Sequence, residues 1–420
     1  MVRSENPPLM ETFTECIKRH SKKLWDGLIE RGAAPSFRED RTLRSFSLGE
    51  VAEFLGVSGS YLRQLSIDGL GPTPELGTAG RRSYTLRQIN DLRAHLARAR
   101  PKEALKFCPR RRKGEKLQII SVAPDSASTT TSFYLAQGLA LQGYKVLAID
   151  LDPKGSLSKM FGYHFPAIAF SGRRPASMYG PLSYDDDDRV SMQTVIQQTH
   201  FDGLDLVPGT LELEMLERKI TKRILKNEKN LRYEDVSIKM VSALKEVEAD
   251  YDVVVIHCGR GAFLTAGAYE AATGVLVTVR PRWPEIASMT MSLEYVSHFG
   301  SVNCDFCKVL VTRYNPRNVS EQEAVAFLRE SLGDDLLTAT VWESDAIRQA
   351  SIKGRSLYEL LAGAVGRSAY EQAMETLNST NAEIMDIISG VWGRPKIYVS
   401  QTSRSATEGK ANSRSGGNSI

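Results

Sequence analysis

Long apolar runs are absent from this 420-residue chain, and cysteine is scarce. No stretch reaches the roughly 20 apolar residues that a membrane-spanning helix needs, and the N-terminus lacks the apolar core of a signal peptide. We therefore expect a cytoplasmic protein that does not bind membranes. The five cysteines do not suggest a disulfide framework. Cys304 and Cys307 form a lone C-x-x-C without a second pair or a nearby histidine to complete a metal site.

Glycine and positive charge are missing from the loop of the one stretch whose pattern is typical of a phosphate-binding unit. An apolar strand, a Pro-containing loop, a helical run and a second apolar strand follow one another at 117–122, 123–128, 129–141 and 145–151. This is a βαβ unit, and its first loop is where phosphate-binding folds place their glycines. The loop has none, and no Lys or Arg lies between residues 117 and 144. The frame of a phosphate site is present without the residues that bind phosphate.

The net charge of +4 is unevenly distributed along the chain. Residues 1–116 contain 23 Lys and Arg against 14 Asp and Glu, whereas the remainder contains 31 against 36. A basic front part thus precedes a mildly acidic body, in a chain long enough for two or more domains. We expect any nucleic acid to be bound by the front part.

The basic front part has the spacing of a helix-turn-helix. Ser47 can cap a first helix, residues 56–58 form a short turn, and a second helix follows that would enter the major groove of DNA. A basic turn before the next helix would act as a wing. Any small three-helix domain can show this pattern, but the clustered arginines favour DNA binding. The candidate DNA-binding residues are Ser60, Tyr61, Arg63, Gln64, Arg81 and Arg82.

The body alternates strands with helices. Strands are expected at 203–208, 251–257, 274–279 and 308–313, and helices at 213–226, 236–247, 286–299 and 321–332. Near-continuous apolar strands in this order predict an α/β fold with a mostly parallel sheet covered on both faces. The expected domains are an N-terminal helix that packs on its own chain or forms a dimerisation arm (1–44), the helix-turn-helix domain (45–100), a basic linker (101–116), the α/β domain (117–400) and a disordered tail (401–420).

Eight stretches occur in series between about residue 10 and residue 393. They are VAEFLGVSGSYLRQLSIDGLGP, GRRSYTL, TTTSFYLAQGLALQGYKVLAIDLDP, GLDLVPGTLELE, YDVVVIHC, AATGVLVTVRP, VLVTRYNP and AIRQASIKGRSLYEL. Together they resemble the RepA-type plasmid partition proteins of the ParA/MinD family of deviant Walker ATPases. The resemblance implies a P-loop-NTPase-like sheet preceded by an all-α, winged helix-turn-helix domain.

In that family the first loop reads K-G-G-x-G-K-T, and the register is set by aligning its threonine with Thr129. Pro124 then has no N–H to donate, Asp125 brings a negative charge toward the phosphates, and Ser128 replaces a lysine. Ala127 replaces a glycine and disfavours positive φ. The first lysine of the family's loop falls on Ala123.

Few residues of the implied nucleotide site remain. A degenerate nucleotide site would consist of Ser128, Thr129, Thr130 and Asp150, with Thr129 as metal ligand only if Mg-nucleotide binds, and with Asp152 as a vestigial catalytic residue that positions water. His257 stands where the family has a metal-handling Asp, and imidazole is a poor ligand for Mg²⁺.

The resemblance implies ATP and Mg²⁺ as cofactors, operator and non-specific DNA and a ParB/RepB-like centromere-binding protein as partners, a homodimer, and association with the bacterial nucleoid. The altered loop argues against ATP hydrolysis and against any cofactor. The predicted function is a DNA-binding, autoregulatory partition protein with a pseudo-ATPase site. Two alternatives stay open: an active partition ATPase, with Arg260, Arg280 and Arg282 as substitute cations, and a transcriptional repressor only.

Overall fold

The computed structural model describes residues 12–31, 41–77, 80–125, 127–164, 176–228, 233–297 and 304–400. The chain divides into two compact units, Met1–Glu39 and Asp40–Ile420. The first unit contributes one described helix, and the second contains all the other described elements. The predicted tail at 401–420 lies outside the described residues. No helix among the residues described here has the length and apolar character needed to cross a lipid bilayer.

The first unit contains α1 (Phe13–Glu30). Its N-terminus is a capping box, in which the Thr12 side chain accepts the backbone N–H of Glu15 and Glu15 accepts the N–H of Thr12. No residue of α1 is buried, and Phe13 and Leu24 are 81% and 71% exposed. Within its own unit, α1 therefore leaves its apolar side chains uncovered.

The second unit begins with what we call the front module, residues 41–107. Ser47 caps α2, and Gly56, with φ of +59°, ends it because glycine tolerates the left-handed region. Ser58 accepts the N–H of Tyr61 at the start of α3, and Thr85 caps α4. The elements are α2 (Leu48–Leu55), α3 (Gly59–Ile67), α4 (Leu86–Ala99), α5 (Ala104–Phe107), β1 (Phe46–Ser47), β2 (Glu75–Leu76) and β3 (Arg82–Tyr84). The strands form a small antiparallel sheet in the order β1-β3-β2.

The body is built on a seven-stranded sheet with the order β10-β9-β4-β8-β5-β7-β6, parallel except for β6. Successive residues of each strand face opposite sides. For example, Val253 and Val255 join one hydrophobic core, whereas Val254 and Ile256 join the other. The strands are β4 (Gln118–Val122), β5 (Val146–Asp150), β6 (Gln197–Gln198), β7 (Leu204–Val207), β8 (Val253–His257), β9 (Gly274–Val279) and β10 (Phe306–Val311).

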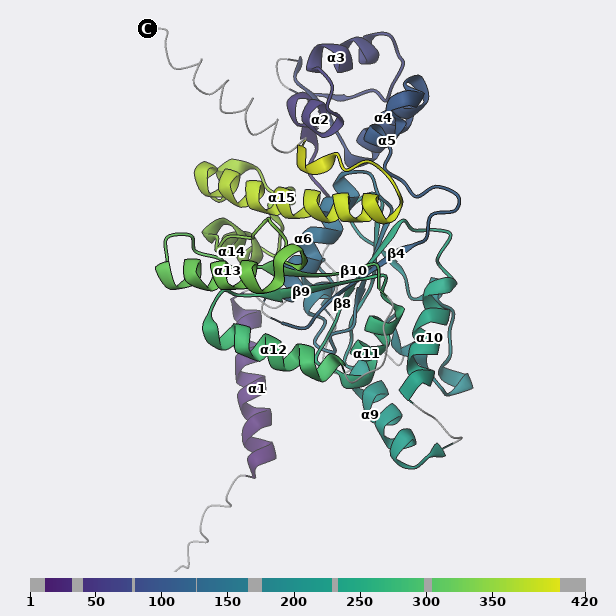
Figure 1. Cartoon of the computed structure of the whole chain (residues 1–420), viewed down its shortest axis with the longest axis vertical. Helices are drawn as coiled ribbons and strands as arrows, with labels where there is room; N and C mark the ends of the chain where they lie inside the picture. Colours follow the sequence, from purple (N-terminus) through teal and green to yellow (C-terminus); the bar gives the residue numbers. More distant parts are fainter. Residues whose placement is uncertain are drawn as a thin grey trace, which may run out of the picture. The chain divides into compact units, whose positions relative to one another are not determined.

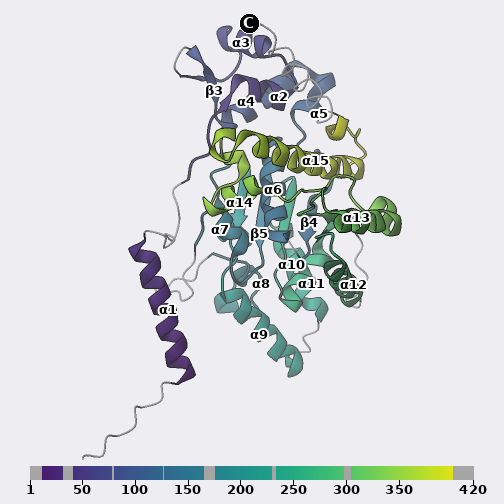
Figure 2. The ribbon, with the colours of Figure 1, turned by 90° about the vertical axis from the view of Figure 1, so that its left-hand side faces the viewer.

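Helices cover both faces of this sheet (Figure 1). Residues of α6, α7, α14 and α15 pack in one core together with the front module, and residues of α8 to α13 pack in the other. Figure 2 shows the front module next to α15. The bounds are α6 (Ser128–Leu141), α7 (Ser156–Met160), α8 (Tyr179–Leu182), α9 (Glu212–Leu225), α10 (Tyr233–Lys245), α11 (Ala262–Ala271), α12 (Trp283–Ser297), α13 (Val319–Leu332), α14 (Asp345–Ile352) and α15 (Arg367–Val391).

The predicted fold class, a mostly parallel sheet between helices behind an N-terminal helical region, is confirmed. The strand predicted at 308–313 begins two residues earlier, at Phe306. The short antiparallel strand β6 and the helices α7, α8, α14 and α15 were not predicted. The described residues divide only into the two units given above. The front module shares a hydrophobic core with the body and does not form a separate unit.

Candidate functional site

A cleft of about 950 Å³ opens at the carboxyl ends of the central strands. Its walls are the loop before α6, the turn after β5 and the turn after β8, which follow strands that are neighbours in the sheet. In open parallel sheets this edge is where ligands bind. Ser128 and Thr129, the first residues of α6, stand in its wall. The strand order thus places the predicted loop where a ligand would be expected.

The backbone of that loop has a glycine-like conformation without glycine. Ala127, directly before α6, has φ of +67°, and no side chain caps the helix. A left-handed conformation costs a non-glycine residue about 1–2 kcal/mol. Ser128 N–H donates to the carbonyl of Asp125 (3.1 Å), and Thr131 N–H donates to that of Ala127 (2.9 Å). The residue directly before α6 therefore has a conformation that glycine favours, although it is alanine.

Thr129, the predicted metal ligand, contacts His257 across the cleft. The distance between Thr129 Oγ1 and His257 Nε2 is 3.2 Å. His257 is only 3% exposed, and its Nδ1 is buried without a hydrogen-bond partner among the described residues. The hydroxyl predicted to bind Mg²⁺ therefore has an imidazole nitrogen within hydrogen-bond distance.

Asp150 and Asp152 lie in different environments. Asp150 is fully buried and accepts hydrogen bonds from Asp152 N–H (3.0 Å), Ser158 N–H (2.8 Å) and the Ser158 hydroxyl (2.7 Å). Burial raises the pKa of Asp150, although His257 and these hydrogen bonds oppose the shift. Asp152 lines the cleft and accepts the N–H of Lys154 (3.0 Å) and the Ser156 hydroxyl. Asp152 faces the cleft, whereas Asp150 holds the turn together from within.

Negative side chains outnumber positive ones around the cleft. Glu217 accepts the N–H groups of Phe263 (3.2 Å) and Leu264 (2.8 Å) at the start of α11, and burial raises its pKa. The lining residues include five carboxylates and two cations, so the field in the cleft disfavours an anion. They are Asp125, Asp152, Glu214, Glu217 and Glu285 against Lys154 and Arg260.

Of the three arginines considered as substitute cations, Arg260 lines the cleft and is exposed. Arg280 is paired with Glu343 (3.2 Å), and Arg282 is paired with Glu321 (3.3 Å). Neither of the paired arginines lines the cleft. The carboxylates from α9 and α12 were missed by sequence reasoning because those helices lie far from the loop in sequence.

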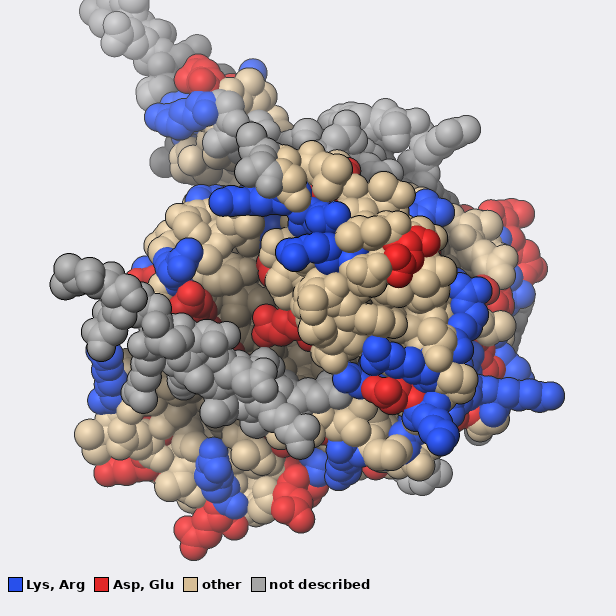
Figure 3. Space-filling view, turned by 90° about the horizontal axis from the view of Figure 1, so that it is seen from above, with Lys and Arg blue, Asp and Glu red and all other residues tan. Residues whose placement is uncertain are grey.

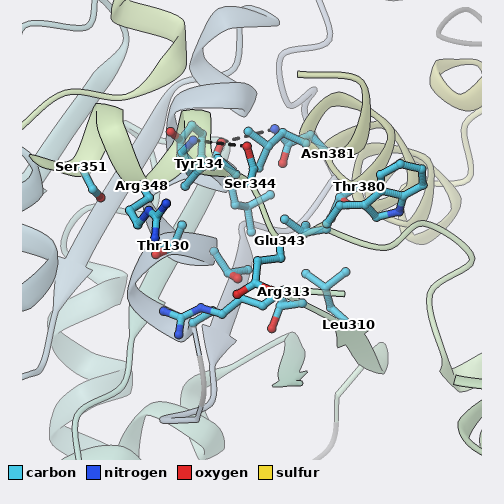
Figure 4. A pocket seen from close by; sticks show the side chains of 18 of the residues that line it. Thr130, Tyr134, Leu310, Arg313, Glu343, Ser344, Arg348, Ser351, Thr380 and Asn381 are labelled. Carbon is cyan, nitrogen blue, oxygen red and sulfur yellow. Dashed lines mark hydrogen bonds between the residues drawn. The ribbon is translucent and has the colours of Figure 1, made fainter. Parts of the chain in front are cut away.

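A second cavity of about 520 Å³ lies on the other side of the first turn of α6 (Figure 4). Thr130, a predicted nucleotide-binding residue, opens onto this cavity and not onto the cleft. Its charged lining is balanced, with two arginines and two carboxylates. These are Arg313, Arg348, Glu343 and Asp345. The predicted loop residues are therefore divided between two hollows.

A third cavity, of about 600 Å³, is mostly apolar and includes Cys304 and Cys307 in its wall. Both are free thiols. Among the described residues, no group of three or more His, Cys, Asp or Glu side chains could hold a metal ion.

The predicted DNA-binding residues of α3 differ in how far they are engaged by the chain itself. Arg63 is exposed. Gln64 is exposed but donates to Asp68 (2.7 Å). The Ser60 hydroxyl lies 3.0 Å from the Ser58 hydroxyl. The Arg100 guanidinium lies over the Tyr61 ring, with its Cζ 4.6 Å from the ring centre.

The predicted wing is the hairpin of β2 and β3. Arg81 is exposed just before β3, and Arg82, in β3, is half-buried. Figure 3, seen from the side of the front module, shows several groups of Lys and Arg with Asp and Glu between them. Helix α3 and this hairpin both belong to the front module.

Comparisons with known proteins agree with this architecture. A family described as an AAA domain matches residues 118–299. The chain is 39% identical over 369 residues to a putative replication protein A of Sinorhizobium fredii, covering 85% of this chain and 89% of the relative. It is 26% identical over 375 residues to SopA of Escherichia coli, covering 84% and 90%. A solved structure named Partition Protein has the same fold, with a TM-score of 0.59, 15% identity, and coverage of 91% and 98%.

Proposed function

The chain belongs to the ParA family of plasmid partition proteins, and from this premise we propose that it binds operator DNA through the front module but does not hydrolyse ATP. The charge of the cleft is the observation that supports the absence of ATP hydrolysis. Five carboxylates and two cations line the place where the family resemblance puts a triphosphate. Contacts of charged groups to phosphate are each worth about 1.5–3 kcal/mol, and their loss, with added repulsion, weakens binding by powers of ten.

Two further observations support the loss of nucleotide chemistry. Pro124 offers no N–H to a phosphate. Thr129, the residue that would bind Mg²⁺, lies 3.2 Å from His257, and imidazole suits so hard a cation poorly. The residues present therefore do not fit a magnesium triphosphate, and we route no step of the function through one.

Equilibrium binding of a fluorescent ATP analogue with Mg²⁺ tests this part. We expect no saturable binding of the native chain in the micromolar range. The matched variant restores the family's residues at six positions and should gain at least 100-fold in affinity. Its substitutions are Ala123→Lys, Pro124→Gly, Asp125→Gly, Ala127→Gly, Ser128→Lys and His257→Asp. Micromolar, Mg²⁺-dependent binding by the native chain would instead support the active-ATPase alternative.

DNA binding is proposed from the exposed faces of α3 and the β2–β3 hairpin. Arg63 and Arg81 are exposed there, and a cation on a phosphate or a guanine edge is the commonest protein contact to DNA. We propose that the module binds the operator of its own gene, which makes the protein autoregulatory, and binds other DNA more weakly through phosphates.

A gel-shift assay with duplexes enriched from a random-sequence pool tests this proposal. Arg63→Ala or Arg81→Ala should weaken binding and reduce the slope of log K against log salt by about one. Arg218→Ala is the matched control, because Arg218 is an exposed arginine of α9 paired only with Glu214 in the same helix (2.5 Å). Unchanged affinity and slope for both front-module variants would contradict the helix-turn-helix assignment.

We further propose that α1 joins two copies into a homodimer. Phe13, Ile17, Leu24 and Leu28 are exposed on a helix with no buried residue, and apolar side chains repeating in this way cover one another in helix pairs. Leu24→Lys should shift the chain to monomer in sedimentation experiments. The other proposed partner is a ParB/RepB-like centromere-binding protein, and the proposed location is the nucleoid.

A further inference from the structure

Arg93 of α4 is a buried guanidinium between the front module and α6. It is 3% exposed, and its Nη2 donates to the carbonyl of Leu141 at 2.9 Å. Its Nη1 donates to the carbonyl of Phe107 at 3.4 Å. Leu141 is the last residue of α6, where carbonyls lack partners inside the helix and carry its partial negative charge. Arg93 thus joins α4 and α5 of the front module to the C-terminal end of α6.

This arrangement is a poor way to gain stability. Neither hydrogen bond of Arg93 goes to a carboxylate, and its Nε is buried without a partner among the described residues. Burial lowers the pKa of Arg93 to about 10. Taking a cation out of water costs several kcal/mol, and an apolar side chain of similar size often serves stability as well or better. Directional hydrogen bonds, however, fix an orientation that apolar packing leaves free.

The turn after α6 is shaped around the same side chain. Gly143 has φ of +96°, and a Cβ added to it would lie 2.8 Å from Arg93 Cδ. A glycine is required there both for the backbone conformation and for the space that Arg93 occupies. Both Arg93 of α4 and Gly143 after α6 are therefore needed for this close contact.

Other polar contacts surround Arg93 at the same junction. Asn90 donates to Asp202 at 2.8 Å, and Arg44 donates to the carbonyl of Tyr358 at 3.2 Å. Arg394 donates to the carbonyls of Pro109 and Arg110, at 2.8 Å each. These contacts lie nearer the surface than Arg93, and they link the module and the segment after it to the body at several points.

We propose that Arg93 is a positioning residue that fixes the orientation of the front module on α6 and so sets the geometry with which a dimer reads DNA. The inference rests on the proposed function. A dimer that binds two half-sites needs its two modules at a fixed spacing and orientation. Arg93 does not contact DNA, because its side chain is buried and both its hydrogen bonds are made within the protein.

The first test compares Arg93→Met with Arg98→Met, which removes the same charge from an exposed position of the same helix. Both are measured on a duplex that the native chain selects from a random pool, and on that duplex with one half scrambled. Arg93→Met should bind the full duplex at least tenfold more weakly than the native chain, and the half duplex within about twofold. Equal losses on the two duplexes, or equal behaviour of the two variants, would overturn the proposal.

The second test needs no DNA. Hydrogen exchange of the backbone at 141–146 and 108–116 should be faster in Arg93→Met than in Arg98→Met, because the module's attachment is loosened. If the native chain selects no duplex, the DNA-binding proposal fails while this measurement still decides whether Arg93 holds the module. Arg93→Lys keeps one donor and should recover part of the protection. If Arg93→Met does not fold, the same comparison is made with Arg93→Lys, and native-like exchange in it would count against the proposal.

Discussion

Helix α6 has one end in the cleft and the other under the front module, and the two ends are stabilised differently. At the N-terminal end, Ala127 adopts φ of +67°, no side chain caps the helix, and the Thr129 hydroxyl lies 3.2 Å from His257 Nε2. At the C-terminal end, Gly143 adopts φ of +96° without strain, and Arg93 donates to the last carbonyl. The C-terminal end has the residue that suits its backbone conformation, whereas the N-terminal end does not.

This difference separates residues that a ligand needs from residues that the fold needs. In a phosphate loop, glycines and lysines serve the phosphate, so a chain without them can still form the sheet and α6. At the other end of α6, the partners of the junction are parts of the same chain. The comparison therefore predicts that substitutions at the two ends have effects of different size and sign.

The largest expected effect on the free energy of unfolding concerns Asp150, a buried acid beside the cleft, and not a residue at either end of α6. Asp150→Ala should lower the free energy of unfolding by about 3 kcal/mol, because the buried N–H and hydroxyl of Ser158 and the partly buried N–H of Asp152 lose their acceptor. Asp152→Ala is the matched control at the cleft surface and should cost less than about 1 kcal/mol, since water can replace its contacts. Urea unfolding followed by tryptophan fluorescence measures both. Equal costs would show that the two acids have the same role.

The second prediction concerns the C-terminal end of α6. Gly143→Ala should destabilise the protein by about 2 kcal/mol, because alanine is strained at positive φ and its Cβ would lie 2.8 Å from Arg93 Cδ. Gly114→Ala is the control, since Gly114 also has positive φ, +92°, but its added Cβ would meet nothing within 4 Å. The difference between the two in urea unfolding isolates the crowding against Arg93. No difference would mean that the turn tolerates the extra carbon.

Much of this architecture could be predicted from the sequence, and the reasons are local. Val253–His257 is an apolar run that only a strand buried on both faces explains, and Ser47 and Gly56 mark the ends of α2. The repeated alternation of apolar strands with helices indicated the mostly parallel sheet. These features depend on neighbours in sequence, so the sequence contains them.

What could not be predicted depends on contacts between distant segments. Helix α15 was missed because Thr380 and Asn381 interrupt its apolar pattern, although both are buried. Thr129 and His257 are 128 positions apart. Arg93 looks like one of several surface arginines in an amphipathic helix, and only the position of α6 makes it buried. Glu214, Glu217 and Glu285 in the wall of the cleft were missed for the same reason.

The third prediction is a gain of stability at the N-terminal end of α6. Ala127→Gly should raise the free energy of unfolding by about 1 kcal/mol, because relief of the left-handed strain exceeds the entropy lost by ordering a glycine. Glycine is thus expected to be the more stabilising residue at both ends of this helix, although only the C-terminal end has it. Ala136→Gly, at a buried position within α6, is the control and should destabilise. A loss of stability in Ala127→Gly would show that the loop is not strained.

The smallest expected effect tests whether the N-terminal end has any internal partner. Thr129→Val keeps the side chain's shape but removes the hydroxyl 3.2 Å from His257 Nε2, and should cost about 0.5 kcal/mol, since this half-buried site can be rehydrated. Thr130→Val is the neighbouring control on the side of the second cavity. A double-mutant cycle of Thr129→Val with His257→Leu should give a coupling of the same size. A coupling of about 0.5 kcal/mol means that the His257 imidazole stabilises this end of α6 through Thr129. If the coupling is zero, His257 does not hold the loop.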